Sequence, residues 1–139
     1  MATRYFALVW GIIFLLVAAS GIVPGLREPA PAHYPPLAVD TWYGAALGLF
    51  PVNILHDLVH LIFGVWGVAA YRSLDASRSY AKIVAIVYVM FAIMGLVPGL
   101  DTTFGLVPLF GNDVWLHLLL AAPAAYFGFV HRDEERQRV

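Results

Sequence analysis

Polar side chains recur at helical spacing at two places in an otherwise apolar sequence. Asn53, His56 and His60 lie three and four residues apart, and Asp113 and His117 are again four residues apart. On a helix, these spacings place each set on one face. Two histidines at i and i+4 can bind one metal ion, and an aspartate with a histidine from a facing helix would complete a tetrahedral site. We therefore take His56, His60, Asp113 and His117 as candidate metal ligands.

Three interpretations of this cluster are compatible with the sequence. The first is structural, with imidazole and carboxyl groups hydrogen-bonded across helices; Asn53 and Asp57 would be supporting polar groups. In the second, the cluster binds a divalent transition metal, or His56, His60 or His117 is an axial ligand of haem or a chlorophyll-type pigment. The third is a proton or ion path through His and Asp relays. No continuous polar track continues through the other half of the apolar segments, which counts against transport.

The composition places this cluster in a lipid environment. Of 139 residues, 61% are hydrophobic and only 12% are charged, whereas about a quarter of a typical soluble chain is charged. There are no cysteines, which excludes thiolate metal sites and iron–sulfur clusters. A net charge of −1 gives no reason to expect nucleic acid as a partner. We find no nucleophile–base pair and no phosphate-binding loop, which favours a non-enzymatic protein.

Four apolar segments could carry these residues across a bilayer: 5–23, 53–71, 80–97 and 114–130. Each is close to the roughly 20 residues that span a hydrocarbon core as a helix. The fold class expected is an all-α integral membrane protein with four transmembrane helices in one domain. With four spans, nearly all basic residues fall on one side, and the positive-inside rule makes that side cytoplasmic. Both termini would then be cytoplasmic, and the location expected is the bacterial inner membrane.

The segments between the predicted spans differ in character. Residues 26–40 contain four prolines, which favour extended and irregular structure. Residues 41–50 are apolar, and we expect a short helix lying on the outer membrane surface. Residues 131–139 read as a charged cytoplasmic tail. The aromatic residues of the spans, Tyr88 among them, are expected to be packing residues or interfacial anchors rather than part of a cofactor cage.

An internal repeat relates the two halves of the sequence. Gly-Ile-Val-Pro-Gly-Leu at 21–26 recurs as Gly-Leu-Val-Pro-Gly-Leu at 95–100, and Gly-Leu-Phe-Pro at 48–51 recurs as Gly-Leu-Val-Pro at 105–108. The sequence thus predicts two parallel helical hairpins, about 5–71 and 80–130, related by a pseudo-two-fold axis along the membrane normal. The repeat aligns His56 with Asp113 and His60 with His117, so these pairs should face each other.

These motifs resemble the small bacterial membrane proteins grouped as domain-of-unknown-function family 4383. The similarity covers nearly the whole chain. It is most distinctive in Asn53-x-x-His56-x-x-x-His60 and in Asp113-x-x-x-His117. The resemblance implies a four-helix membrane protein and no established activity.

Together, these observations predict a small non-enzymatic membrane protein. It would be an accessory or structural subunit, or a bundle that holds a ligand between its second and fourth helices. Its partners would be the lipid bilayer and either a larger membrane complex or further copies of the chain. The alternatives are a metal- or tetrapyrrole-binding protein and a small ion or proton permease.

Overall fold

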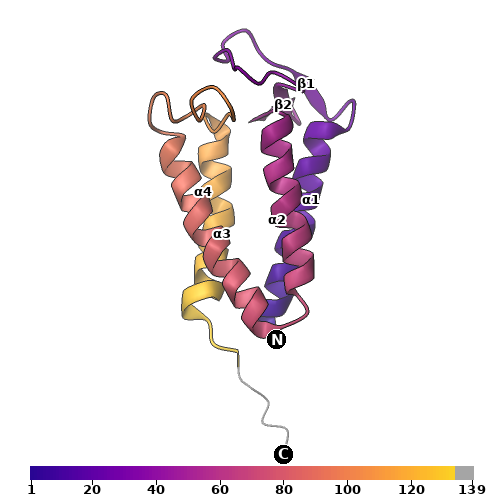
Figure 1. Ribbon diagram of the computed structural model, residues 1–139, viewed down its shortest axis with the longest axis vertical. Coiled ribbons are helices and arrows are strands. Elements are labelled where there is room, and N and C mark those ends of the chain that lie inside the picture. The colour runs from indigo at the N-terminus through magenta and orange to yellow at the C-terminus, as the bar shows by residue number, and fades with distance from the viewer. Residues whose placement is uncertain (134–139) are drawn as a thin grey trace, which may run out of the picture.

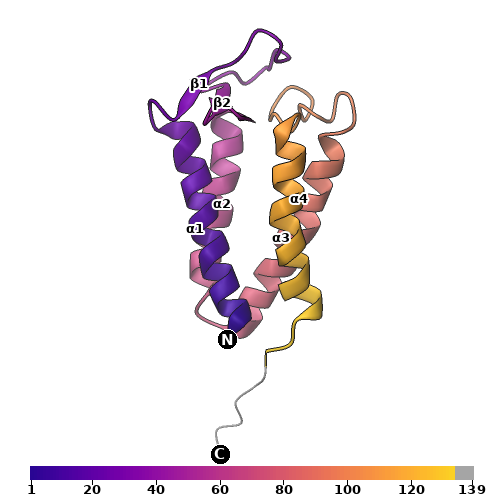
Figure 2. The same ribbon diagram turned by 180° about the vertical axis from the view of Figure 1, so that it is seen from behind.

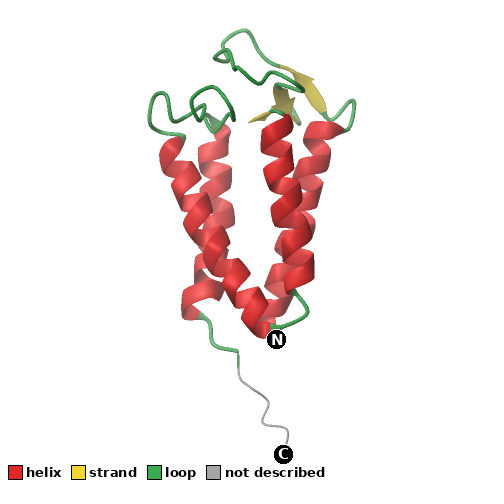
Figure 3. Ribbon diagram, in the orientation of Figure 1, coloured by secondary structure: helices red, strands yellow, loops and turns green. Residues whose placement is uncertain are grey.

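The computed structural model describes residues 1–133, which form helices and a small sheet (Figures 1 and 3). The helices are α1 (Ala2–Ile22), α2 (Ile54–Ala70), α3 (Leu74–Met94) and α4 (Asn112–Ala125), and α4 continues into the π-helix η1 (Tyr126–Val130). Each predicted apolar segment lies largely within one of them. Helix α3 begins six residues before the predicted span because Ser73 caps it, its hydroxyl oxygen accepting from the Ala76 amide at 3.1 Å.

The helices form two pairs, α1 with α2 and α3 with α4 (Figures 1 and 2). The pairs converge at the end where the N-terminus and the α2–α3 turn lie, and they diverge toward the strands. Helix η1 ends beside the N-terminus, so both helical termini of the chain lie at one end of the molecule. This end is called the terminal end below, and the other is called the loop end.

Glycines set the close packing within the first pair. A methyl group at Gly11 would lie 2.6 Å from the Val68 amide nitrogen and 2.8 Å from the Gly64 carbonyl oxygen. Backbone thus meets backbone, an approach that only small residues permit. The two pairs meet through a buried core in which the rings of Phe14 in α1 and Tyr88 in α3 pack with centroids 5.0 Å apart. Apolar residues fill this core between the histidine cluster and the terminal end.

The loop end contains a small antiparallel sheet, so the all-α expectation needs correction. Strands β1 (Arg27–Pro29), β2 (Gly44–Ala46) and β3 (Phe50–Val52) pair in the order β1-β2-β3. The helix predicted at 41–50 is wrong, because Trp42, Leu47 and Gly48 adopt left-handed backbone conformations that interrupt it. A Cβ on Gly44 would meet the Glu28 carbonyl oxygen, so this glycine allows β1 and β2 to pair closely.

The two outer loops cover the helix ends together. The Ala38 amide donates to the Gly105 carbonyl at 2.8 Å, which joins the proline-rich loop to the loop before α4. In the outer loop of each pair, a non-glycine residue and the following glycine have positive φ: 54° and 69° at Leu47-Gly48, and 57° and 87° at Phe104-Gly105.

Three helical segments are long and apolar enough to cross a membrane: α1, α3 and the combined segment Asn112–Val130. Helix α2 has 17 residues and is a shorter apolar helix. Large apolar side chains point outward along all of them, including Leu16, Ile62, Ile86 and Leu119. These features indicate a membrane protein. Of the predicted tail at 131–139, residues 134–139 lie outside the described part of the chain.

Candidate functional site

The start of α2 positions the first two histidines. Asn53 is the N-cap residue, and its side-chain oxygen accepts from the His56 amide at 3.0 Å. One helical turn separates His56 from His60, so their rings stack with centroids 4.7 Å apart and planes 16° apart. The Asn53 amide group donates to the Val39 carbonyl at 2.8 Å and to the Leu106 carbonyl at 2.7 Å. One buried side chain therefore ties both outer loops to the helix end that carries the histidines.

The start of α4 supplies the facing residues. Gly111 precedes the helix with φ of 66°, a conformation that glycine adopts without strain. Asp113 and His117 then project from successive turns toward α2. The Asp113 carboxylate lies 3.5 Å from His56 Nδ1, and the His117 ring centroid lies 6.0 Å from that of His56. Each of these side chains is at most 3% exposed.

The three histidines form one compact group. Each offers a ring nitrogen within 4.8 Å of those of the other two. Nitrogen ligands around one tetrahedral zinc ion are separated by about 3.3 Å, as follows from zinc–nitrogen bonds of about 2.0–2.1 Å. The rings would have to move closer by roughly 1.5 Å at most to share one ion. All three rings line the same cavity.

The His60 ring is oriented for coordination. Its Nδ1 lies 3.2 Å from the His56 carbonyl oxygen, which can only accept a hydrogen bond. Nδ1 therefore carries the hydrogen, and Nε2 presents a lone pair to the cluster. A backbone carbonyl at the second ring nitrogen is the usual arrangement for metal-binding histidines. Within residues 1–133, His60 Nε2 and His117 Nδ1 are buried without hydrogen-bond partners.

The carboxylates predicted for the site have different surroundings. Asp113 contacts the histidine group through His56 alone, and it does not belong to the compact group of three. Asp57 is buried against α1, where a Cβ on Gly21 would collide with its carboxylate. Both Asp57 oxygens lack a hydrogen-bond partner in the described part of the chain. Asp57 thus faces the α1–α2 contact and not the histidines.

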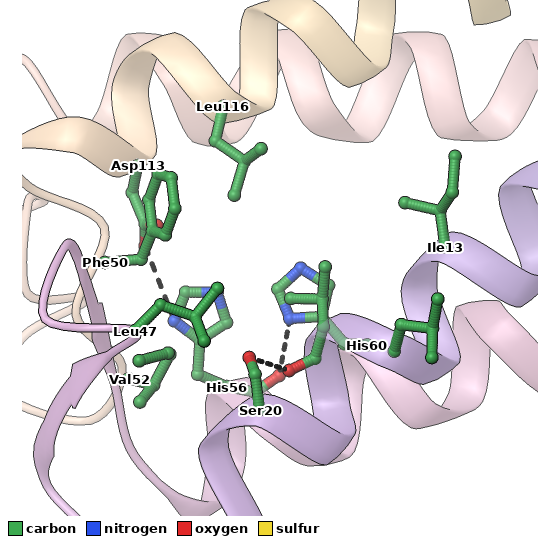
Figure 4. Close-up of a pocket in the computed structure, with 12 residues that line it drawn as sticks. Ile13, Ser20, Leu47, Phe50, Val52, His56, His60, Asp113 and Leu116 are labelled. Carbon is green, nitrogen blue, oxygen red and sulfur yellow. Dashed lines mark hydrogen bonds and ion pairs between the residues drawn. The ribbon is translucent and has the colours of Figure 1, made fainter. Parts of the chain in front are cut away.

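Two apolar cavities flank the cluster. The first, of about 210 Å³, lies between α1 and α4, with Ile13 and Leu116 on its walls and His56, His60 and Asp113 on its inner side (Figure 4). The second, of about 170 Å³, lies between α2 and α3 and is lined by Phe91, His60 and His117. Figure 4 shows Asp113 pointing from α4 to His56, and His60 facing the cavity beside it.

Sequence reasoning missed two residues at this site. Tyr88, expected only to pack, has its ring centroid 5.2 Å from that of His117 and 6.2 Å from that of His60. Its hydroxyl is buried and has no partner within residues 1–133. Ser20 lines the first cavity, although its hydroxyl donates to the Val17 carbonyl at 2.7 Å. In the sequence repeat, Tyr88 aligns with Phe14. The tyrosine hydroxyl is the one polar group by which the two residues differ, and it was the sequence indication for Tyr88.

Tyrosines of the outer loops lie above the cluster. The Tyr34 ring packs edge-on against Phe110 at 4.9 Å. Burial raises the pKa of Tyr34, and the negative charge of nearby Asp113 raises it further. Burial and the neighbouring Tyr34 also raise the pKa of Tyr43 to about 12, and the Tyr43 hydroxyl donates to the Pro35 carbonyl at 2.8 Å. The proline-rich loop is thus held in place by aromatic packing and a partly buried hydrogen bond.

Comparisons with known proteins give one match. No curated protein and no solved structure is similar enough to this chain to be matched. The model of a family described as domain of unknown function (DUF4383) matches residues 4–130, which include all four helices and every residue of the cluster. The resemblance seen in the histidine and aspartate motifs is thereby confirmed, and the chain belongs to the DUF4383 family.

Proposed function

We propose that this protein crosses the bacterial inner membrane four times and holds a divalent transition metal ion between its two helix pairs. The outward apolar side chains of all four helices support the membrane placement. Helix α2 is short for a span, but it is closely packed on α1, and its 17 residues extend over about 25 Å at 1.5 Å each. The excess of basic residues at the terminal end supports cytoplasmic termini.

The burial pattern supports two copies of one hairpin. Six of the eight buried positions of α1 are buried again in α3 after a shift of 74 residues, as from Gly11 to Ala85 and from Phe14 to Tyr88. The matched positions are Thr3, Phe6, Ala7, Gly11, Phe14 and Ala18 with Ser77, Tyr80, Ala81, Ala85, Tyr88 and Ala92. Burial that repeats position by position is expected of duplicated hairpins and not of chance similarity between apolar segments.

The second and fourth helices agree with this repeat. After a shift of 57 residues, as from His60 to His117, five of the six buried residues of α2 align with buried residues of α4. The matched positions are His56, Asp57, His60, Gly64 and Gly67 with Asp113, Val114, His117, Ala121 and Ala124. The His56–Asp113 contact would then join equivalent positions across the pseudo-axis. The two cavities would be equivalent as well, since one lies between α1 and α4 and the other between α3 and α2.

The observation that carries the metal proposal is the compact group of three buried histidines. One ring nitrogen of each lies within 4.8 Å of those of the other two, and His60 Nε2 and His117 Nδ1 have no hydrogen-bond partner among the described residues. A buried polar atom without a partner costs about 1–3 kcal/mol, so such a group favours an added ligand. Imidazole ligands suit zinc, copper, iron and nickel. Asp113 would orient His56 or become a fourth ligand after a small rotation.

The other ligand and transport interpretations have less support. Cofactor sites usually measure about 300–1,000 Å³, and cavities of about 210 and 170 Å³ are small for haem or a chlorophyll-type pigment. An ion path would have to continue from the cluster to the terminal end. Phe14, Val84, Ala81 and Ala124 are buried there, within an apolar core. These residues favour a site that holds an ion over a path that conducts it.

Zinc binding to the untagged protein in mild detergent tests the proposal. After removal of metal with a chelator and addition of zinc, we expect about one zinc ion per chain by mass spectrometry of the metal content. Variants His60→Gln and His117→Gln should lower the zinc affinity at least about tenfold. The control is His33→Gln, because His33 is exposed in the proline-rich loop. Its zinc affinity should equal that of the original protein.

Two results would overturn the proposal. One is a zinc content far below one per chain in the original protein, or an affinity that His117→Gln leaves unchanged. The other is that His60→Gln and His117→Gln lower the melting temperature by the same amount in zinc as in chelator. That second result would support the structural interpretation of the cluster. Association with a larger membrane complex or self-association stays a prediction.

A further inference from the structure

A basic pocket lies at the terminal end, far along the helices from the histidine cluster. It measures about 170 Å³ and is formed between α3 and the end of η1. Arg78 and Lys82 of α3 line one side, and His131 and Arg132 line the other, with Gly128 and Phe129 between them. Within the described chain, no carboxylate lines this pocket.

The π-helix builds the second wall of the pocket. Pro123 lies in the last turn of α4. After Ala125 the chain continues as η1, whose wider turn ends with the His131 amide donating to the Tyr126 carbonyl at 2.8 Å. A Cβ on Gly128 would lie 2.9 Å from the Lys82 amide nitrogen, so the glycine brings η1 directly against α3. Single π-turns are often found at functional sites.

Within residues 1–133, neither Arg78 nor Lys82 forms a salt bridge with a carboxylate. Arg78 donates a long hydrogen bond of 3.4 Å to the His131 carbonyl, while its buried Nε atom has no partner in that part of the chain. The Lys82 ammonium lies over the Phe129 ring at 5.7 Å. Asp133 contacts the N-terminal ammonium and His131, which lines the pocket. Several cationic donors thus converge on a space suited to an anion.

The surroundings of the pocket distinguish a lipid from a free anion. Arg78, Lys82 and Ile86 are four residues apart, so they follow one another along one face of α3. Ile86 is 61% exposed, and Met90 and Ile93 continue the exposed apolar surface. Phe129 and Val130 are also exposed beside the pocket. An apolar surface therefore begins one helical turn beyond the cations. The acyl chains of a lipid whose phosphate group lies at the cations would need such a surface.

We propose that this pocket binds the phosphate group of an anionic phospholipid, with the acyl chains along Ile86 and the exposed apolar surface of α3. Basic pockets between membrane helices on the cytoplasmic side bind anionic headgroups by such charge pairing. The proposal rests on the membrane placement of the helices and is independent of metal binding. It gives the basic residues at the terminal end a specific partner in addition to their effect on orientation.

Lipid binding to the full chain in detergent tests this assignment. Native mass spectrometry with added phosphatidylglycerol or phosphatidylcholine should give preferential retention of phosphatidylglycerol. The double variant Arg78→Gln/Lys82→Gln should weaken phosphatidylglycerol binding about 20-fold or more, since each basic residue near an anionic surface contributes about fivefold. Arg72→Gln is the matched control, because Arg72 is an exposed arginine of the α2–α3 turn outside the pocket. Its phosphatidylglycerol binding should change little.

Each alternative gives a different result. Equal retention of both lipids, or an equal loss of binding in Arg72→Gln, would overturn the proposal in favour of general surface charge. Displacement of phosphatidylglycerol by millimolar inorganic phosphate would overturn the lipid assignment and leave a free-anion site. If the double variant does not fold, Lys82→Gln alone carries the test, because it keeps the bond from Arg78 to His131. Its expected loss of binding is then about fivefold.

Discussion

Single polar side chains position the centre of this protein. Asn53 caps α2 through its oxygen and holds both outer loops through its amide group. His56 and His60 follow on the same helix, so their ring positions depend on where that helix begins. His60 is further oriented by its own hydrogen bond to the backbone. At this scale, hydrogen bonds to main-chain atoms hold Asn53 and orient His60, and substitutions elsewhere in the core do not remove them.

The substitution Asn53→Ala tests this dependence. It removes the helix cap, at about 1 kcal/mol, and leaves the Val39 and Leu106 carbonyls without their donor, at about 1–3 kcal/mol. We expect the free energy of unfolding to fall by roughly 2–4 kcal/mol. Thermal unfolding in mild detergent measures it. Asn112→Ala is the control, since exposed Asn112 donates one hydrogen bond, to the Leu49 carbonyl. A loss as small as that of the control would show that Asn53 does not organise the loop end.

At the scale of elements, small residues decide how the helices meet. Gly11 and Gly64 let the backbones of α1 and α2 touch, and Gly128 does the same for η1 and α3. The helices of each pair thus contact one another closely. Side chains fill the interface between the two pairs, where the cavities and the histidines lie. Tight pairs with a looser interface are what a ligand site between hairpins needs, since the site can adjust without opening either pair.

Gly11→Ala tests the close contact. Alanine is a better helix former than glycine by about 1 kcal/mol, which alone would stabilise α1. The added methyl group would meet backbone atoms of α2 at 2.6–2.9 Å, and backbone cannot move aside as a flexible side chain does. Overpacking costs about 1–3 kcal/mol, so we expect a lower melting temperature. Ala69→Leu, the control, adds bulk at an exposed position of α2 and should change the melting temperature little. An unchanged melting temperature in Gly11→Ala would contradict the packing described for α1 and α2.

At the scale of the whole molecule, the site lies where the two helix pairs face each other. The His56–Asp113 contact joins α2 to α4, and Phe14 on Tyr88 joins α1 to α3. If the pairs are copies of one hairpin, the molecule supplies a site from two equivalent faces that have diverged in their polar residues. One copy then contributes two histidines, and the other contributes an aspartate and a histidine.

Exchanging two residues across the proposed axis tests the repeat. His56→Asp alone brings two carboxyl groups together, and Asp113→His alone brings two imidazoles together, so both single variants should be destabilised. The double variant restores one imidazole and one carboxyl group at equivalent positions. We expect it to be more stable than the sum of the single effects by about 1–3 kcal/mol, measured by unfolding in the presence of chelator. Purely additive effects would speak against equivalence of the two positions.

Much of the helical structure could be predicted from the sequence, because apolar length and scarcity of charge are local properties. The four apolar segments, the family and the spacing that puts His56 with His60 on one helix face all follow from it. The strands at residues 27–29, 44–46 and 50–52 could not be predicted, because the pairing of Gly44 with Pro29 depends on a contact between distant segments. The surface helix predicted at 41–50 is wrong because Trp42, Leu47 and Gly48 have left-handed backbone conformations.

The sequence by itself thus determined which polar residues cost free energy when they are buried in an apolar chain, and on which helices they lie. Only the tertiary structure decided which of them meet. It brought His56, His60 and His117 together, left Asp113 in contact with His56 alone, and turned Asp57 toward Gly21. It also added Tyr88 to the cluster. The physical reason is that spacing along one helix defines a face, whereas the partner of that face depends on how glycines and loops set the helices against one another.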